Sequence, residues 1–125
     1  MEAYRTFKDL EVWAKSRSLV KEIYLMTSNL PNAEVYGLVS QMRRSAISVP
    51  SNIAEGYGRQ YKKETIHFLH IARGSLYELE TQLYICFDLR YIDETTLNTI
   101  VRMIEECRKR LSGLIKYFET NTMLQ

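Results

Sequence analysis

The sequence predicts an all-α protein, folded as an antiparallel up-down-up-down four-helix bundle in a single domain, residues 1–125. Apolar residues recur at intervals of three and four along four segments, which is the spacing of one face of an α-helix. The links between these segments are short, and short links place successive helices antiparallel. No segment shows the alternation of apolar and polar residues that is typical of a half-buried strand.

The first two helices are expected over residues 10–29 and 33–57. The apolar positions are Trp13, Val20, Ile23 and Leu30 in the first, and Leu38, Met42, Ala46, Val49 and Ile53 in the second. Ser16 and Thr27 interrupt the first stripe. The stretch NLPN separates the two helices, and Asn32 is a plausible N-cap for the second.

The third and fourth helices are expected over residues 63–90 and 95–120. The third carries Leu69, Ala72, Leu76, Leu79, Leu83 and Cys86, and the fourth carries Leu97, Ile100, Ile104, Cys107, Leu111, Leu114 and Phe118. Charged residues of the fourth helix turn largely away from its heptad seam. The stretch GYGRQ precedes the third helix, and Asp93 in the stretch YIDE is placed to cap the fourth.

Pro50 lies inside the pattern of the second helix. A proline there removes one backbone hydrogen bond and clashes with the carbonyl of Ala46, at a cost of about 3 kcal/mol. The apolar phase continues on both sides, so we expect one continuous helix with a kink at Pro50. Water or a hydroxyl from Ser48 or Ser51 would then meet the freed carbonyl. A functional surface is the alternative explanation, because local violations of foldability often mark a site.

The composition is that of an ordinary globular chain, with 46% hydrophobic and 26% charged residues. Its net charge of +2 is too small to indicate nucleic-acid binding, so such a function must rest on local clustering. Cys86 and Cys107 fall on apolar helical positions and are expected to be reduced core thiols. The sequence predicts no cofactor and no metal site. The sequence shows neither a secretion signal nor an apolar run long enough to span a membrane, so we expect a cytoplasmic protein with no membrane role.

A polar stripe runs along the second helix, opposite its apolar face: Gln41, Arg44, Ser48, Asn52, Glu55 and Arg59. Short hydrogen-bonding groups suit recognition, or a packed polar contact, better than a solvated helix face. Between residues 41 and 73 the chain has six basic residues and two acidic ones, and Tyr57 and Tyr61 supply aromatic surfaces nearby. This clustering favours phosphate contacts with nucleic acid. The alternative is that these side chains only solvate one corner of the bundle.

A second stripe lies on the third helix, where His70, Tyr77, Tyr84 and Tyr91 are one heptad apart and off the core seam. Aromatic residues at such positions indicate a covered surface, which makes this stripe a candidate interface between copies of the chain. Ordinary partial burial of tyrosines along a groove of the bundle explains the same pattern.

Enzymatic functions have weaker support. Glu64 and His67 form an ExxH pair, but di-iron bundles need two such pairs and further carboxylates on facing helices, and the chain has two histidines. No nucleophile with an oriented base and no glycine-rich phosphate loop is recognisable. The sequence therefore predicts a protein that is not an enzyme.

Several stretches resemble the bacterial 23S rRNA intervening-sequence proteins, also called the S23 ribosomal protein-like family: FKDLEVW, YGLVSQMRRSAISVPSNIAEGYGR, FLHIARGSLYELETQL and the YI before the last helix. The resemblance implies a four-helix bundle, a homopentameric ring and no settled biochemical activity. It extends to the accessory proteins of diversity-generating retroelements, basic pentamers that associate with a reverse transcriptase and nucleic acid. The residues that match characteristic family positions are Arg44, Ser51, Asn52, Glu55, Gly56, Arg59, Gly74, Ser75 and Glu78. Where relatives commonly have a serine that caps the third helix, this chain has Tyr61.

Together these observations predict a non-enzymatic, oligomeric binding protein that engages RNA, a ribonucleoprotein or a nucleic-acid-processing protein. The alternative is a scaffold that binds itself and a protein partner, with no nucleic-acid role. The candidate binding residues are Arg43, Arg44, Ser48, Ser51, Asn52, Glu55, Arg59, Lys62, Lys63, His67, Arg73, Ser75 and Glu78. The candidate oligomer interface is Tyr77, Tyr84 and Tyr91.

Overall fold

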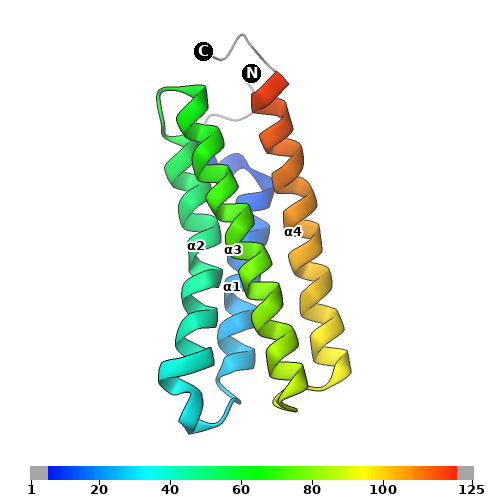
Figure 1. Ribbon diagram of the computed structural model, residues 1–125. Helices are drawn as coiled ribbons and strands as arrows, with labels where there is room; N and C mark the ends of the chain where they lie inside the picture. Colours follow the sequence, from blue (N-terminus) through cyan, green and yellow to red (C-terminus); the bar gives the residue numbers. More distant parts are fainter. Residues whose placement is uncertain (1–5, 121–125) are drawn as a thin grey trace.

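The computed structural model describes residues 6–120, and over this range the chain forms four long α-helices and no strand (Figure 1). The helices are α1 (Glu11–Thr27), α2 (Ser40–Tyr57), α3 (Lys62–Asp88) and α4 (Glu94–Thr120). Each helix packs against the next, and α1 also contacts α4, which closes the bundle. The connection between α2 and α3 lies at the upper end in Figure 1, and the other two connections lie at the lower end. The predicted four-helix bundle is confirmed.

The second helix begins later than the sequence predicts. We expected it from residue 33, but α2 begins at Ser40, after a 3-10 turn (η2, Asn32–Glu34) and a π-helical turn (η3, Val35–Val39). Gly37 has non-helical angles, φ −111° and ψ −109°, and the Glu34 side chain accepts a hydrogen bond from the Leu38 N–H at 3.3 Å. The expected N-cap at Asn32 is therefore wrong. At the start of α4, the expected cap is confirmed: the Thr96 N–H donates to Asp93 Oδ1 at 2.8 Å.

Most of the predicted apolar positions meet in one core, whereas Trp13, Val20, Leu38, Leu114 and Phe118 are only partly buried against it. Among the fully buried side chains are Leu19, Ile23, Met42, Ile53, Leu69, Leu76, Leu79, Leu83, Ile104 and Leu111. Ser16 and Thr27, the polar interruptions of the first stripe, are buried too, and their hydroxyls donate to the carbonyls of Trp13 and Ile23. These bonds satisfy the buried hydroxyls within their own helix.

Both cysteines are free and buried, as expected for core thiols. Burial raises the pKa of Cys86 and that of Cys107 to about 11. The Cys86 thiol lies 3.5 Å from the Met42 sulfur. None of the helices between residues 6 and 120 combines the length and apolar character needed to cross a bilayer.

Helix α2 continues through Pro50, which confirms the single rod expected from the apolar phase. Ala46 and Ile53, on either side of the proline, are both fully buried, so the two halves present their apolar sides to the same core. The kink itself remains a prediction. The hydroxyl of Ser48, which we considered as a partner for the freed carbonyl of Ala46, bonds instead to Ser75 of α3.

Candidate functional site

A small polar network joins α2 to α3 near the middle of the bundle. The Ser48 and Ser75 hydroxyl oxygens lie 2.8 Å apart, and Asn52 Nδ2 donates to the Ser48 carbonyl at 2.8 Å and to the Ser48 hydroxyl at 2.9 Å. Ser48 and Asn52 are half-buried, and Ser75 is 9% exposed. Because each group has a partner, the network fixes how α2 aligns with α3 without leaving buried polar atoms unpaired.

Helices α2 and α3 approach each other closely at Gly56. A Cβ atom added there would lie 2.8 Å from Phe68 Cβ and 3.1 Å from the Thr65 carbonyl oxygen. The Thr65 hydroxyl donates to the Gly56 carbonyl at 2.8 Å, across the same contact. The glycine is therefore required by packing, which explains why this sequence places one inside the helix just before the connection.

Glu55 pairs within its own helix. Its carboxylate accepts a hydrogen bond from Arg59 Nη2 at 2.6 Å, and the Arg59 guanidinium lies 4.6 Å from the centre of the Phe68 ring. Arg59 follows Glu55 by four residues, the spacing at which two side chains on one helix meet. Both partners of this ion pair are exposed, so it contributes little to stability.

Two of the predicted basic residues turn away from this region. Arg43 contacts the end of α1, where Nε donates to the Thr27 hydroxyl at 2.9 Å and the guanidinium lies over the Tyr24 ring. Arg73 contacts α4, where Nη1 donates to the Ser112 hydroxyl at 3.1 Å. The cluster of six basic residues in the sequence is therefore not one continuous patch in space.

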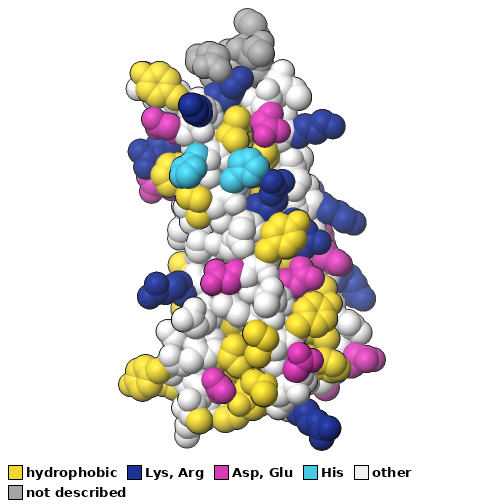
Figure 2. Space-filling view, in the orientation of Figure 1, with side chains coloured by type: hydrophobic (Ala, Val, Ile, Leu, Met, Phe, Trp, Pro, Cys, Tyr) yellow, Lys and Arg dark blue, Asp and Glu magenta, His cyan; other side chains and the backbone are white. Residues whose placement is uncertain are grey.

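We divide most of the remaining candidate residues, together with Gly74, into two groups by their position along α2 and α3. We call the first the basic end; it comprises Arg59, Lys62, Lys63 and His67, beside the α2–α3 connection. We call the second the central face; it comprises Arg44, Ser48, Ser51, Asn52, Gly74, Ser75 and Glu78 on α2 and α3. Figure 2 shows both histidines in the upper half of the molecule with lysines and arginines around that end, whereas hydrophobic side chains gather lower down.

Helix α3 begins without a side-chain cap at the basic end. Tyr61 occupies the cap position, and its side chain accepts no hydrogen bond from the helix. Lys62 and Lys63 make no ion pair or side-chain hydrogen bond within residues 6–120. The Tyr61 ring is 55% exposed next to them. The basic end therefore presents free cations beside an aromatic ring.

The tyrosine stripe does not stay on one surface. Tyr77 and Tyr84 are 54% and 46% exposed on α3, and the Arg108 guanidinium lies 4.9 Å from the centre of the Tyr77 ring. Tyr91 lies beyond the end of α3, where its hydroxyl donates to Glu34 Oε2 at 2.9 Å. This hydrogen bond raises the pKa of Tyr91 and attaches the α3–α4 turn to the turns before α2.

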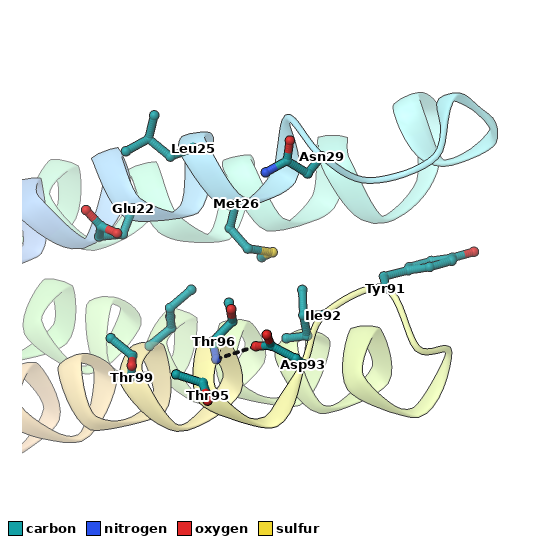
Figure 3. Close-up of a pocket in the computed structure, with 11 residues that line it drawn as sticks. Glu22, Leu25, Met26, Asn29, Tyr91, Ile92, Asp93, Thr95, Thr96 and Thr99 are labelled. Carbon is teal, nitrogen blue, oxygen red and sulfur yellow. Dashed lines mark hydrogen bonds between the residues drawn. The ribbon is translucent and has the colours of Figure 1, made fainter.

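A groove of about 460 Å³ lies between α1 and the start of α4, and no pattern in the sequence predicted it (Figure 3). Its polar lining includes Glu22, Asn29, Asp93 and three threonines, and its apolar lining includes Leu25 and Met26. The Asp93 carboxylate already caps α4, which lowers its pKa. No lysine, arginine, histidine or cysteine lines the groove, so it lacks the paired acid and base that would indicate catalysis.

The ExxH pair does not belong to a metal-binding cluster. Glu64 and His67 are both exposed, and within residues 6–120 no group of three His, Cys, Asp or Glu side chains could hold a metal ion. His70 lies on the α4 side of α3, where its Nε2 is 3.9 Å from a carboxylate oxygen of Glu119 and its Nδ1 is 3.0 Å from Arg73.

Comparisons with known proteins agree with this architecture. The chain is similar to a crystal structure of a protein of unknown function from the S23 ribosomal protein family of Bacteroides thetaiotaomicron VPI-5482, with a TM-score of 0.78 and 27% sequence identity. The match covers 84% of this chain and 95% of that protein. The comparison with curated proteins finds no match, and no enzyme family is indicated. Residues 8–113 match the family described as 23S rRNA-intervening sequence protein, and the chain therefore belongs to that family.

Proposed function

We propose that this protein is a non-enzymatic, homo-oligomeric binding protein whose basic end engages RNA, free or within a ribonucleoprotein. The observation that carries the proposal is the exposed Tyr61 ring beside the unpaired Lys62 and Lys63. Ammonium groups attract the phosphate backbone, and an exposed aromatic ring provides a stacking surface for an unpaired base. Single-stranded RNA offers both groups together, whereas a duplex keeps its bases stacked.

Oligomerisation is part of this proposal because one copy of the basic end is a weak site. Glu55 neutralises Arg59, and Glu64 lies in the same helical turn as Lys62 and Lys63, so the local excess of positive charge is small. Several copies in one assembly would bind a long RNA with much higher avidity than a single chain. A ring of five chains, which the family resemblance implies, would bring five basic ends to one particle.

Fluorescence anisotropy with a labelled single-stranded RNA tests the proposal. Affinity should fall steeply as the salt concentration rises. The double substitution Lys62→Ala/Lys63→Ala should weaken binding, and it should reduce the slope of log affinity against log salt concentration by about 1 for each lysine that contacts a phosphate. Lys21→Ala/Lys109→Ala is the matched control, because these two lysines are exposed on α1 and α4, away from the basic end. Equal losses in both double variants would contradict a localised site.

A scaffold function without nucleic acid is the second candidate. The central face favours it, because Arg44 and Glu78 balance each other and the remaining members are small and uncharged. Such a surface suits contact with protein more than contact with a polyanion. An assembly that remains intact but fails to bind RNA even at low ionic strength would favour this second function.

A further inference from the structure

A small pocket lies where the α2–α3 connection meets the last turns of α4. Figure 1 shows these two segments at the same end of the bundle. The pocket has a volume of about 150 Å³, and its lining comes from the end of α2, the connection, the start of α3 and the end of α4. Sites for drug-sized ligands have volumes of about 300–1,000 Å³. This pocket therefore suits one small group, such as a single planar ring system.

Three aromatic side chains contribute to the lining: Tyr57 of α2, and Tyr117 and Phe118 of α4. The Phe118 ring contacts both tyrosine rings edge to face, with centroid distances of 6.3 Å to Tyr57 and 5.4 Å to Tyr117. We call these three residues the aromatic cluster. All three are half-buried, so part of their ring surface remains accessible. Ordered, accessible rings of this kind are the surfaces on which unpaired bases stack.

The polar side chains of the lining differ in whether they already have partners. Arg59 is bound to Glu55, and the Thr65 hydroxyl donates to a carbonyl of α2. Gln60 and Lys62, by contrast, make no side-chain hydrogen bond or ion pair within residues 6–120. An ammonium group binds a phosphate, and a carboxamide both donates to and accepts from the edge of a base. The groups available to a ligand are therefore one cation and one carboxamide.

The charge of the pocket separates it from the larger groove between α1 and α4. Among the described residues, no aspartate or glutamate lines the pocket, whereas Arg59 and Lys62 do. The larger groove has the opposite character, because Glu22 and Asp93 line it and no lysine or arginine does. A pocket with rings, a cation and no carboxylate suits one nucleotide of a polyanion better than it suits a cationic ligand.

We propose that this pocket receives the base of one unstacked RNA nucleotide. The base stacks on the aromatic cluster, the Gln60 carboxamide bonds to the edge of the base, and Lys62 holds the adjoining phosphate. Single strands and bulges can turn one base outward, whereas a duplex cannot without breaking a pair. The inference rests on the RNA binding of the proposed function. It adds a selective pocket for an unpaired base and a contact from α4, at Tyr117, that the proposed function does not use.

A single-stranded oligouridine of about 12 nucleotides, with one 2-aminopurine in its middle and a fluorescent label at one end, tests the pocket. Anisotropy of the label measures binding, and quenching of the 2-aminopurine measures stacking of that base. The wild type should bind the RNA and quench the base. Tyr117→Leu keeps an apolar side chain but removes the ring, so it should bind about fivefold to tenfold more weakly and lose much of the quenching. Tyr117→Phe should keep both signals.

Tyr36→Leu is the matched control, because this tyrosine is 95% exposed in η3, at the other end of the bundle. It should behave as the wild type, and circular dichroism should show the same helical signal for each variant. Gln60→Ala removes no hydrogen bond within the described residues, so it tests the pocket without disturbing the fold, and it should weaken binding about threefold to tenfold.

The two readouts separate the pocket from RNA binding itself. Quenching that is unchanged in Tyr117→Leu, or affinity that is unchanged in Gln60→Ala, would overturn the pocket and leave RNA binding by the basic end standing. A wild type that does not bind the RNA at low ionic strength would overturn both. A base held in the pocket should also crosslink to Tyr117 in addition to residues 59–67, and not along the rest of α4.

Discussion

Replacing Gly56 with alanine should destabilise the bundle, although alanine is the better helix former. The new Cβ would lie 2.8 Å from Phe68 Cβ, which is fixed to the backbone of α3, so the two helices must move apart. Overpacking of this kind costs about 1–3 kcal/mol, and the contact here is close enough to place it in the upper half of that range. Helix propensity returns about 1 kcal/mol. The expected net loss in unfolding free energy is about 1–2 kcal/mol.

Urea denaturation followed by far-UV circular dichroism measures this loss, at one fixed protein concentration because assembly shifts apparent stability. Gly113→Ala is the matched control: its Cβ meets nothing within 4 Å, so it should stabilise the protein by about 0.5–1 kcal/mol. Replacing glycine with alanine should therefore lower the unfolding free energy at position 56 and raise it at position 113. A Gly56→Ala variant as stable as Gly113→Ala would refute the close approach of α2 and α3 at this point.

Three further predictions concern the cap, the thiols and the polar network. The hydrogen bond from the Thr96 N–H lowers the pKa of Asp93 below its usual 3.8, so it stabilises the fold above that pH. This stabilisation is lost as the pH falls through the folded-state pKa. In acid unfolding below about pH 4, the stability advantage of wild type over Asp93→Asn should therefore shrink. Burial raises the pKa of Cys86 and of Cys107 to about 11. A thiol reagent at about pH 8 should therefore label neither cysteine in the native protein and both after unfolding. Rapid labelling of the native protein would contradict their burial. A double-mutant cycle of Ser48→Ala and Ser75→Ala should give a coupling energy of about 0.5–1.5 kcal/mol, and additive losses would show that the two hydroxyls do not bond.

The helices were predictable because their apolar residues repeat with helical spacing and the seams meet in one core. Pro50 did not mislead the prediction, because Ala46 before it and Ile53 after it keep the same phase. The start of α2 could not be found in this way. It depends on the Glu34 carboxylate reaching the Leu38 N–H and on the backbone angles of Gly37, and apolar spacing carries no information about either.

The candidate site was only partly predictable for a similar reason. Helical spacing placed Ser48 and Asn52 on one stripe, and the structure joins both to Ser75 of α3. The sequence overestimated the size of the basic cluster, because residues that are close in sequence can point to different sides of a helix. A long arginine side chain then reaches the neighbouring helix on its own side. Arg43 extends to α1 and Arg73 to α4, so neither remains near the basic end.

The features that the sequence could not predict are contacts between helices. Gly56 and Gly74 look alike in the sequence, yet one is required by packing and the other has open space beside it. The Oε1 atom of Gln82, which is buried without a hydrogen-bond partner, likewise has no signature in the sequence, because its burial depends on how the helices pack. Both features depend on the three-dimensional packing of the helices.

Photocrosslinking of the protein to a labelled single-stranded RNA, followed by mass-spectrometric mapping of the attached peptides, tests the central claim most directly. The proposal predicts crosslinks within residues 59–67, with Tyr61 and the adjacent lysines among the modified positions. Crosslinks distributed over α1 and α4, or none at low ionic strength, would contradict an RNA-binding basic end.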